Sequence, residues 1–188
     1  MKEVELWWIG AAEPDAALLD DVRSRLAAAF GVRVALRAPR ARPPDTFDPR
    51  RRQHASAAFL RWLATMSAGR VVAVTDVDLF MPVLTFVFGE AQLGGRCAIV
   101  STARLAAEGG HRREARLAKE VVHELGHTFG LLHCEHPSCA MHRSAGLRDV
   151  DAKDERLCPD CRRRLRARED EERSHEHDAW AHTDTGGG

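Results

Sequence analysis

Apolar residues follow two kinds of spacing over the first hundred positions. Short, mostly apolar runs predict buried strands, and five of them occur at residues 4–9, 32–36, 70–76, 85–89 and 96–101. Between them, residues 15–30 and 53–66 carry apolar side chains three or four positions apart, which predicts helices packed by one face. The opening order of strand, helix and strand indicates an α/β sheet with parallel strands.

A third helix is predicted over residues 111–129. Its apolar face is formed by Leu117, Val121, Val122, Leu125 and Phe129. Polar residues alternate with these positions, and two of them are histidines near the end of the helix. The packed apolar face should therefore support a polar face that bears the histidines.

Composition limits the class of protein. The chain has 188 residues, 44% of them hydrophobic, which fits one domain with its own core. The formal net charge is zero, so no overall field favours nucleic acid or a membrane surface. The first residues lack the pattern of a secretion signal, and no apolar run approaches the ~18 residues of a membrane span. We therefore expect a cytoplasmic protein, in which five cysteines indicate metal or redox chemistry before disulfides.

The segment from His123 to His133 reads His-Glu-Leu-Gly-His-Thr-Phe-Gly-Leu-Leu-His. His123 and His127 are four residues apart, so a helix places both on one face, where they can bind a single ion. Gly130 permits the turn that ends the helix and returns His133 as a third ligand. Three imidazoles with one open position are typical of a catalytic zinc site.

Glu124 follows the first histidine and is the expected general base, acting on a zinc-bound water without ligating the metal. The shorter pattern His-Glu-x-x-His also occurs by chance on amphipathic helices. Gly130 and His133 at the required offsets make chance a poor explanation.

A second group of candidate ligands follows directly. Cys134, Cys139, Cys158 and Cys161 can form a four-thiolate zinc site, which is closed and structural. His136 and His142 are possible substitutes, although four cysteines already saturate the ion. Two alternatives remain: a disulfide framework, which conflicts with the expected compartment, and a nucleic-acid-binding zinc knuckle, because four arginines follow at positions 162, 163, 164 and 166.

Three other features have mainly structural interpretations. Asp76 and Asp78 share a strand face and could act together on a metal, but their place at a strand end favours turn hydrogen bonds. The arginine- and proline-rich residues 37–52 could bind nucleic acid, although a solvated connection is the favoured interpretation. Cys97 is expected to be a small core residue.

The long histidine pattern is the metzincin metalloprotease signature, and the cysteines after it resemble those of the archaemetzincins, peptidase family M54. Residues 74–80, 86–90 and 93–95 are also similar to that family. The resemblance implies a metzincin-like zincin domain with a mixed, mostly parallel five-stranded sheet, whose antiparallel edge strand borders the cleft and pairs with substrate. It also implies that Met141 forms an apolar floor under the histidines.

We therefore expect a zinc metallopeptidase with two zinc ions, one catalytic and one structural, that acts as a monomer on peptide or protein substrates. Residues 1–168 should form one domain, with a sheet and helix part at 1–130 and a zinc-stapled part at 131–168. Residues 169–188 should be a disordered tail. The alternative is a zinc-stabilised binding module or pseudo-protease, with an intact metal site but no general proteolysis.

Overall fold

A five-stranded sheet lies at the centre of the computed structural model, which describes residues 3–11, 13–106 and 110–181. The strand order is β2-β1-β5-β8-β7. Four strands are mutually parallel, and β7, at one edge, is antiparallel to β8. The mixed, mostly parallel five-stranded sheet expected from the sequence is thus confirmed. Its strands span Glu3–Ile9 (β1), Arg33–Leu36 (β2), Arg70–Thr75 (β5), Gly89–Ala91 (β7) and Cys97–Ser101 (β8).

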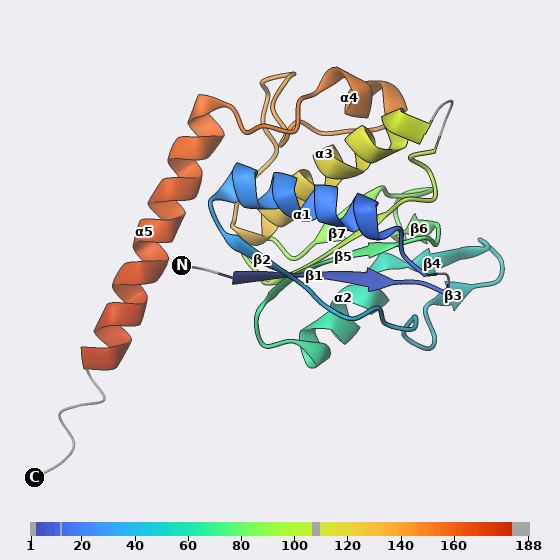
Figure 1. Ribbon diagram of the computed structural model, residues 1–188, viewed down its shortest axis with the longest axis horizontal. Coiled ribbons are helices and arrows are strands. Elements are labelled where there is room, and N and C mark those ends of the chain that lie inside the picture. Colours follow the sequence, from blue (N-terminus) through green and yellow to red (C-terminus); the bar gives the residue numbers. More distant parts are fainter. Residues whose placement is uncertain (1–2, 12, 107–109, 182–188) are drawn as a thin grey trace, which may run out of the picture.

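Helices cover both faces of this sheet (Figure 1). Helices α1 (Ala16–Phe30) and α3 (Gly110–Thr128) lie on one face, and α2 (Ser56–Met66) lies on the other. The side chains of β1 alternate between the two cores: Trp8 packs with the first pair of helices, and Trp7 packs with α2. Burial on both faces explains why the central strands read as continuous apolar runs instead of alternating with polar residues.

Local signals fix the limits of α1. The Asp15 carboxylate accepts the backbone N–H groups of Ala17 and Leu18 at 3.0 and 3.2 Å, and so caps the first turn. Gly31 ends the helix in the left-handed conformation, with φ of 64°. Because capping depends on residues within one turn, the sequence predicts these limits to within one residue.

The predicted boundaries of one strand and one helix were wrong, because these boundaries depend on pairing between distant segments. The strand expected at residues 85–89 is displaced to β7, and Val87 forms only an isolated bridge to Leu79. The helix expected from residue 53 starts at Ser56, since the preceding residues form a strand of a second, three-stranded sheet. That sheet contains β3 (Phe47–Asp48), β4 (Gln53–Ala55) and β6 (Leu79–Phe80).

Arginines of the segment 37–52 contact other parts of the chain. The Arg40 guanidinium lies 5.1 Å from the centre of the Trp7 ring, and that of Arg51 lies 4.6 Å from the Phe80 ring. Arg51 also donates to the backbone oxygen of Leu84 at 3.0 Å. These contacts attach the segment to both sheets. They support a connecting role over a nucleic-acid surface.

The C-terminal part carries α4 (Leu147–Ala152) and α5 (Pro159–Ala181). Helix α5 leads away from the body of the protein (Figure 1). It includes residues 169–181, for which the sequence predicted a disordered tail. Charge pairs such as Arg168 with Glu171, 3.4 Å apart, support a solvated helix. Residues 182–188 lie outside the described part, and the division at residue 168 stays a prediction. In the described ranges, no helix is long and apolar enough to cross a membrane.

Packing of α2 on the sheet can be tested at Phe59, which is fully buried. Phe59→Ala should lower the free energy of unfolding by about 3–5 kcal/mol, because it leaves a cavity between helix and sheet. Urea denaturation measures this loss. The control is Met66→Ala on the same helix, where the side chain is 42% exposed; its effect should stay near 0.5 kcal/mol. Equal losses for the two variants would contradict the packing described.

Candidate active site

Two histidines project from the last turns of α3. Their placement follows from the opposite, apolar face of the helix, where Leu117, Val121 and Leu125 are fully buried in the core. The rings of His123 and His127 lie with centroids 4.6 Å apart, and their Nε2 atoms are separated by 3.1 Å. The four-residue spacing therefore brings two potential ligand atoms to one point.

A sharp turn after α3 brings the third histidine back. Gly130 has a φ of 82°, and its N–H donates to the backbone oxygen of His127 at 2.9 Å. Such a positive φ favours glycine, which has no Cβ to clash. The His133 ring centroid then lies 5.3 Å from that of His123 and 4.9 Å from that of His127. All three candidate ligand atoms fall within 4.8 Å of one another.

Backbone carbonyls orient two of the imidazoles. Nδ1 of His123 donates to the Ala140 oxygen at 2.8 Å, and Nδ1 of His127 donates to the Leu131 oxygen at 2.7 Å. A proton on Nδ1 leaves the Nε2 lone pair free to bind a metal. Two nitrogens bound to one tetrahedral zinc at 2.0–2.1 Å are roughly 3.3 Å apart, close to the 3.1 Å between these Nε2 atoms. The arrangement thus fits zinc.

The histidines are also held in the protonation state that a metal needs. Burial lowers the pKa of His123, His127 and His133 below the ordinary histidine value. The lowering is largest at His123, where the nearby Lys153 ammonium adds to the effect of burial. Because a neutral imidazole is the ligand, these shifts keep the lone pairs available near neutral pH.

Glu124 lies beside the histidines but outside the group of converging ligand atoms. Burial raises the pKa of its carboxyl well above the ordinary value, and the neighbouring carboxylates of Glu120 and Glu90 act in the same direction. Glu90 belongs to the edge strand β7, so this strand borders the same site. A buried carboxyl with a raised pKa, next to a metal site, suits an exchange of protons with a substrate or water.

Met141 packs directly under the helix that bears the histidines. Its side chain is fully buried, and a Cβ added at Gly126 would meet the Met141 sulfur at 2.4 Å. Only a glycine at this position allows the methionine to approach so closely. The methionine thus lies where the resemblance to metzincins implied, beneath the His123 and His127 turn.

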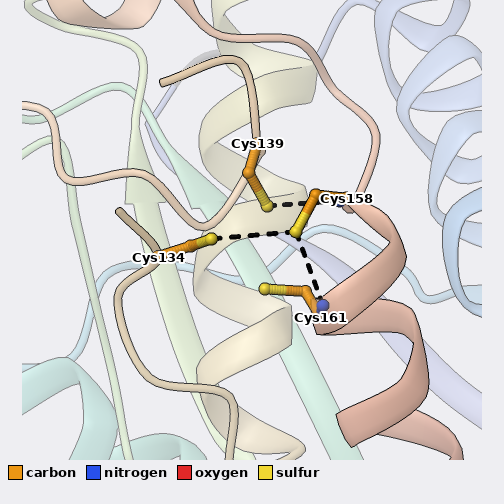
Figure 2. Close-up of side chains that lie close together, drawn as sticks. All are labelled: Cys134, Cys139, Cys158 and Cys161. Carbon is orange, nitrogen blue, oxygen red and sulfur yellow. Dashed lines mark hydrogen bonds between the residues drawn. The ribbon is translucent and has the colours of Figure 1, made fainter. Parts of the chain in front are cut away.

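The four cysteines of the second group converge from the segment after His133 and from the start of α5 (Figure 2). The sulfurs of Cys134 and Cys158 are 3.7 Å apart, and thiolates bound to tetrahedral zinc at 2.3 Å are roughly 3.8 Å apart. Although burial alone would raise it, hydrogen bonds from the Cys161 N–H and from neighbouring thiols lower the pKa of Cys158 to about 7. Burial raises the pKa of Cys139 and Cys161, so the case for zinc rests on the geometry of the four sulfurs. The donor set therefore fits a structural zinc.

The two possible substitute ligands have other partners. His142 Nδ1 donates to the Cys134 backbone oxygen at 2.8 Å, and His136 Nδ1 lies 3.2 Å from the Ser138 hydroxyl. Among the described residues, neither histidine belongs to a group whose ligand atoms converge. The four arginines after Cys161 are exposed, and the zinc-knuckle alternative stays untested.

Of the two carboxylates near the end of β5, Asp78 has a structural role. Arg104 binds both oxygens of Asp78 at 2.7 Å, and Gln53 donates to the same carboxylate at 3.0 Å. Asp76 does not converge with it on any described group of metal-ligand atoms. Cys97 is fully buried among apolar side chains of β5 and α2, as expected for a core residue.

An ion pair between Lys153 and Glu120, buried beneath the site, was not predicted from the sequence. The Lys153 ammonium lies 2.9 Å from the Glu120 carboxylate, and both side chains are almost completely buried. Glu120 lies one helical turn before Glu124, a spacing that could have drawn attention to it. Lys153 offers no such signal, because it follows a short polar helix far along the chain.

Comparison with known proteins identifies relatives of this arrangement. The family model described as "Peptidase family M54" matches residues 63–167. An archaemetzincin of Halobacterium salinarum is 38% identical over 150 residues, which cover 74% of this chain and 87% of that protein.

Solved structures agree with this relationship. The crystal structure of the archaemetzincin of Methanopyrus kandleri superposes with a TM-score of 0.80 at 32% identity, over 88% of this chain and 95% of that one. A zinc-dependent peptidase from Methanocorpusculum labreanum superposes with a TM-score of 0.75 at 28% identity, over 86% and 99% of the two chains. Sequence, fold and site chemistry therefore agree that the chain belongs to peptidase family M54, the archaemetzincins, and is a zinc metallopeptidase.

Proposed function

We propose that the protein hydrolyses peptide bonds at a zinc ion held by His123, His127 and His133, with Glu124 as the general base. The observation that carries this proposal is the convergence of three imidazole nitrogens within 4.8 Å, beside a buried carboxyl that is not one of the ligands. Three protein ligands leave one position of a tetrahedral zinc open for chemistry. A purely structural zinc site has no need of Glu124.

The mechanism assigns two proton transfers to Glu124. When bound, zinc supplies a Lewis acid that acidifies a water molecule and polarises a peptide carbonyl. The Glu124 carboxylate takes the proton from the attacking water and then passes it to the leaving amine. The chain contains no tyrosine, so no phenol shares the negative charge that develops on the carbonyl oxygen.

The edge strand β7 supports an extended peptide as substrate. Within the described part of the chain β7 pairs with β8 alone, in antiparallel register from Gly89 with Val100 to Ala91 with Ala98. A peptide added along its other edge would gain backbone hydrogen bonds that do not depend on the peptide's sequence. Glu90 of this strand is close enough to Glu124 to influence its pKa. A peptide paired with β7 would therefore pass beside the proposed base.

We also propose a second zinc ion, bound by Cys134, Cys139, Cys158 and Cys161, with a structural role. Four thiolates leave no position for water. Since Cys134 directly follows His133, an ion in the cysteine site would restrain the third histidine through one peptide unit. Each chain would then hold two zinc ions.

The role of Glu124 is tested by Glu124→Ala. The variant should retain zinc, because Glu124 is not a ligand, and should cleave peptides roughly 10²–10⁴-fold more slowly. Cleavage of a peptide mixture is followed by mass spectrometry, and bound zinc by elemental analysis. Glu114→Ala, at an exposed position of the same helix, is the matched control and should retain full activity.

Two outcomes would contradict the proposal. A Glu124→Ala protein as active as the wild type would remove Glu124 from the mechanism. A zinc-loaded wild-type protein that binds peptides but cleaves none would favour the alternative of a zinc-stabilised binding module.

The histidine pKa values predict how stability of the zinc-free protein depends on pH. Below about pH 6.5 the unfolded chain takes up protons at its histidines, whereas burial keeps His123 neutral in the folded protein. Acid therefore favours the unfolded state, and His123 contributes stability above pH ~6.5 that is lost as the pH falls toward its lowered pKa.

Urea midpoints across this pH range test the sign of the effect. The buried Glu124, with its raised pKa, has the opposite dependence, so the comparison is best made in the Glu124→Gln background. There, His123→Gln should flatten the loss of stability on acidification. His136→Gln, at an exposed position, is the control. Identical pH profiles for His123→Gln and its parent would show that His123 is not held neutral by burial.

A further inference from the structure

Two opposite charges are buried beneath the histidine site, where apolar side chains would be expected. The side chains of Lys153 and Glu120 are only 0% and 4% exposed, and Nζ lies 2.9 Å from Oε1. Removing two charges from water carries a large desolvation penalty, and well-packed apolar residues in place of a buried ion pair are often at least as stabilising. The pair therefore calls for an explanation beyond stability.

The contacts of Lys153 point to a role in orienting the histidine site. Besides Glu120, its ammonium donates to the backbone oxygen of His142 at 3.2 Å and lies 3.4 Å from Nδ1 of His123. When His123 binds a metal through Nε2, its Nδ1 carries a proton and cannot accept from Lys153. With a metal bound to His123, Lys153 would therefore keep its hydrogen bond to the His142 carbonyl but not a hydrogen bond to the imidazole.

That carbonyl is one of three in a row, each bonded to a different part of the site. The Ala140 oxygen accepts from Nδ1 of His123 at 2.8 Å, and the Met141 oxygen accepts the Cys134 N–H at 3.0 Å. The His142 oxygen accepts from Lys153. The turn Ala140–His142 therefore orients the first histidine, holds the residue after the third histidine, and is itself held by Lys153.

Besides the Ala140–His142 turn, Glu120 of helix α3 binds the Lys153 ammonium. It lies on α3, three residues before His123, and its Oε1 also accepts from the Ser144 hydroxyl at 3.3 Å. Lys153 follows α4, which packs beside α3 (Figure 1). Its backbone N–H caps α4 by donating to the backbone oxygen of Asp149 at 3.2 Å. The ion pair thus joins the helix that bears His123 and His127 to the turn that orients His123.

We propose that Lys153 and Glu120 are positioning residues for the histidine site: together they hold the Ala140–His142 turn against His123, so that its Nε2 points at the metal. The role is geometric and requires no change of protonation. Partners outside the ligands themselves typically contribute about 10–100-fold to metal affinity. This inference rests on the proposed assignment of His123 as a zinc ligand.

Four variants separate positioning from simple stability. Lys153→Met removes the ammonium and leaves the buried Glu120 carboxylate without its oppositely charged partner, so the variant should fold less stably. The double variant Lys153→Met/Glu120→Leu removes both charges and should recover stability. Glu120→Gln keeps an oxygen that can accept from Lys153. Arg116→Met is the matched control, because Arg116 lies on α3 like Glu120, about two turns before His123. Its almost buried guanidinium forms an ion pair with Asp151 of α4.

The readout is the affinity of the histidine site for Co²⁺, titrated into protein whose cysteine site already holds zinc and followed by the absorption of bound Co²⁺. Lys153→Met and the double variant should both raise Kd by about 10–100-fold. Glu120→Gln should raise it less, and Arg116→Met should leave it unchanged. Urea denaturation of the same samples should show that the double variant regains stability without regaining affinity.

The inference is overturned if the double variant folds and binds Co²⁺ with the wild-type Kd, or if Arg116→Met weakens binding as much as Lys153→Met does. His123→Ala in the same titration distinguishes this failure from failure of the proposed function. Unchanged Co²⁺ binding by His123→Ala would remove His123 from the ligands and with it both proposals. Lost binding by His123→Ala, with wild-type binding by the double variant, would remove only the positioning role.

Discussion

The chain has one peptide bond, between His133 and Cys134, on which both candidate metal sites depend. On one side of it, the turn at Gly130 returns His133 to the histidines of α3. On the other side, Cys134 meets the cysteines at the start of α5. The N–H of this peptide bond, which belongs to Cys134, donates to the Met141 carbonyl at 3.0 Å. The C-terminal part of the chain therefore contributes a histidine to the candidate active site.

Many buried polar groups meet in the small region beneath this peptide bond. Carbonyls of the Ala140–His142 turn bond to an imidazole, to a backbone N–H and to an ammonium. The buried carboxyls of Glu120 and Glu124 lie on the adjacent helix. Each buried polar group without a partner would reduce stability. The polar contacts beneath the candidate site thus pair these groups, and the Ala140 carbonyl also orients the His123 ring.

Much of the candidate site could be predicted from the sequence, because its determinants are local. The spacing of His123 and His127 reflects one turn of helix, and Gly130 reflects a backbone angle that other residues avoid. The sheet was predictable for a similar reason, since buried strands are short apolar runs. Lys153 could not be found in this way: its partner lies 33 positions earlier, and a lysine in a polar segment gives no sign of burial. The position of β7 and the second sheet likewise depend on pairing between distant segments.

We propose that one chain holds two separate zinc sites, one built from histidines and one from cysteines. Elemental analysis of zinc per chain after mild chelation tests it most directly, on the wild type and on His123→Ala/His127→Ala. We expect two zinc ions per chain in the wild type and one in the double variant. A single zinc that survives loss of both histidines would mean that only the cysteine site binds metal, and would contradict the assignment of a catalytic zinc.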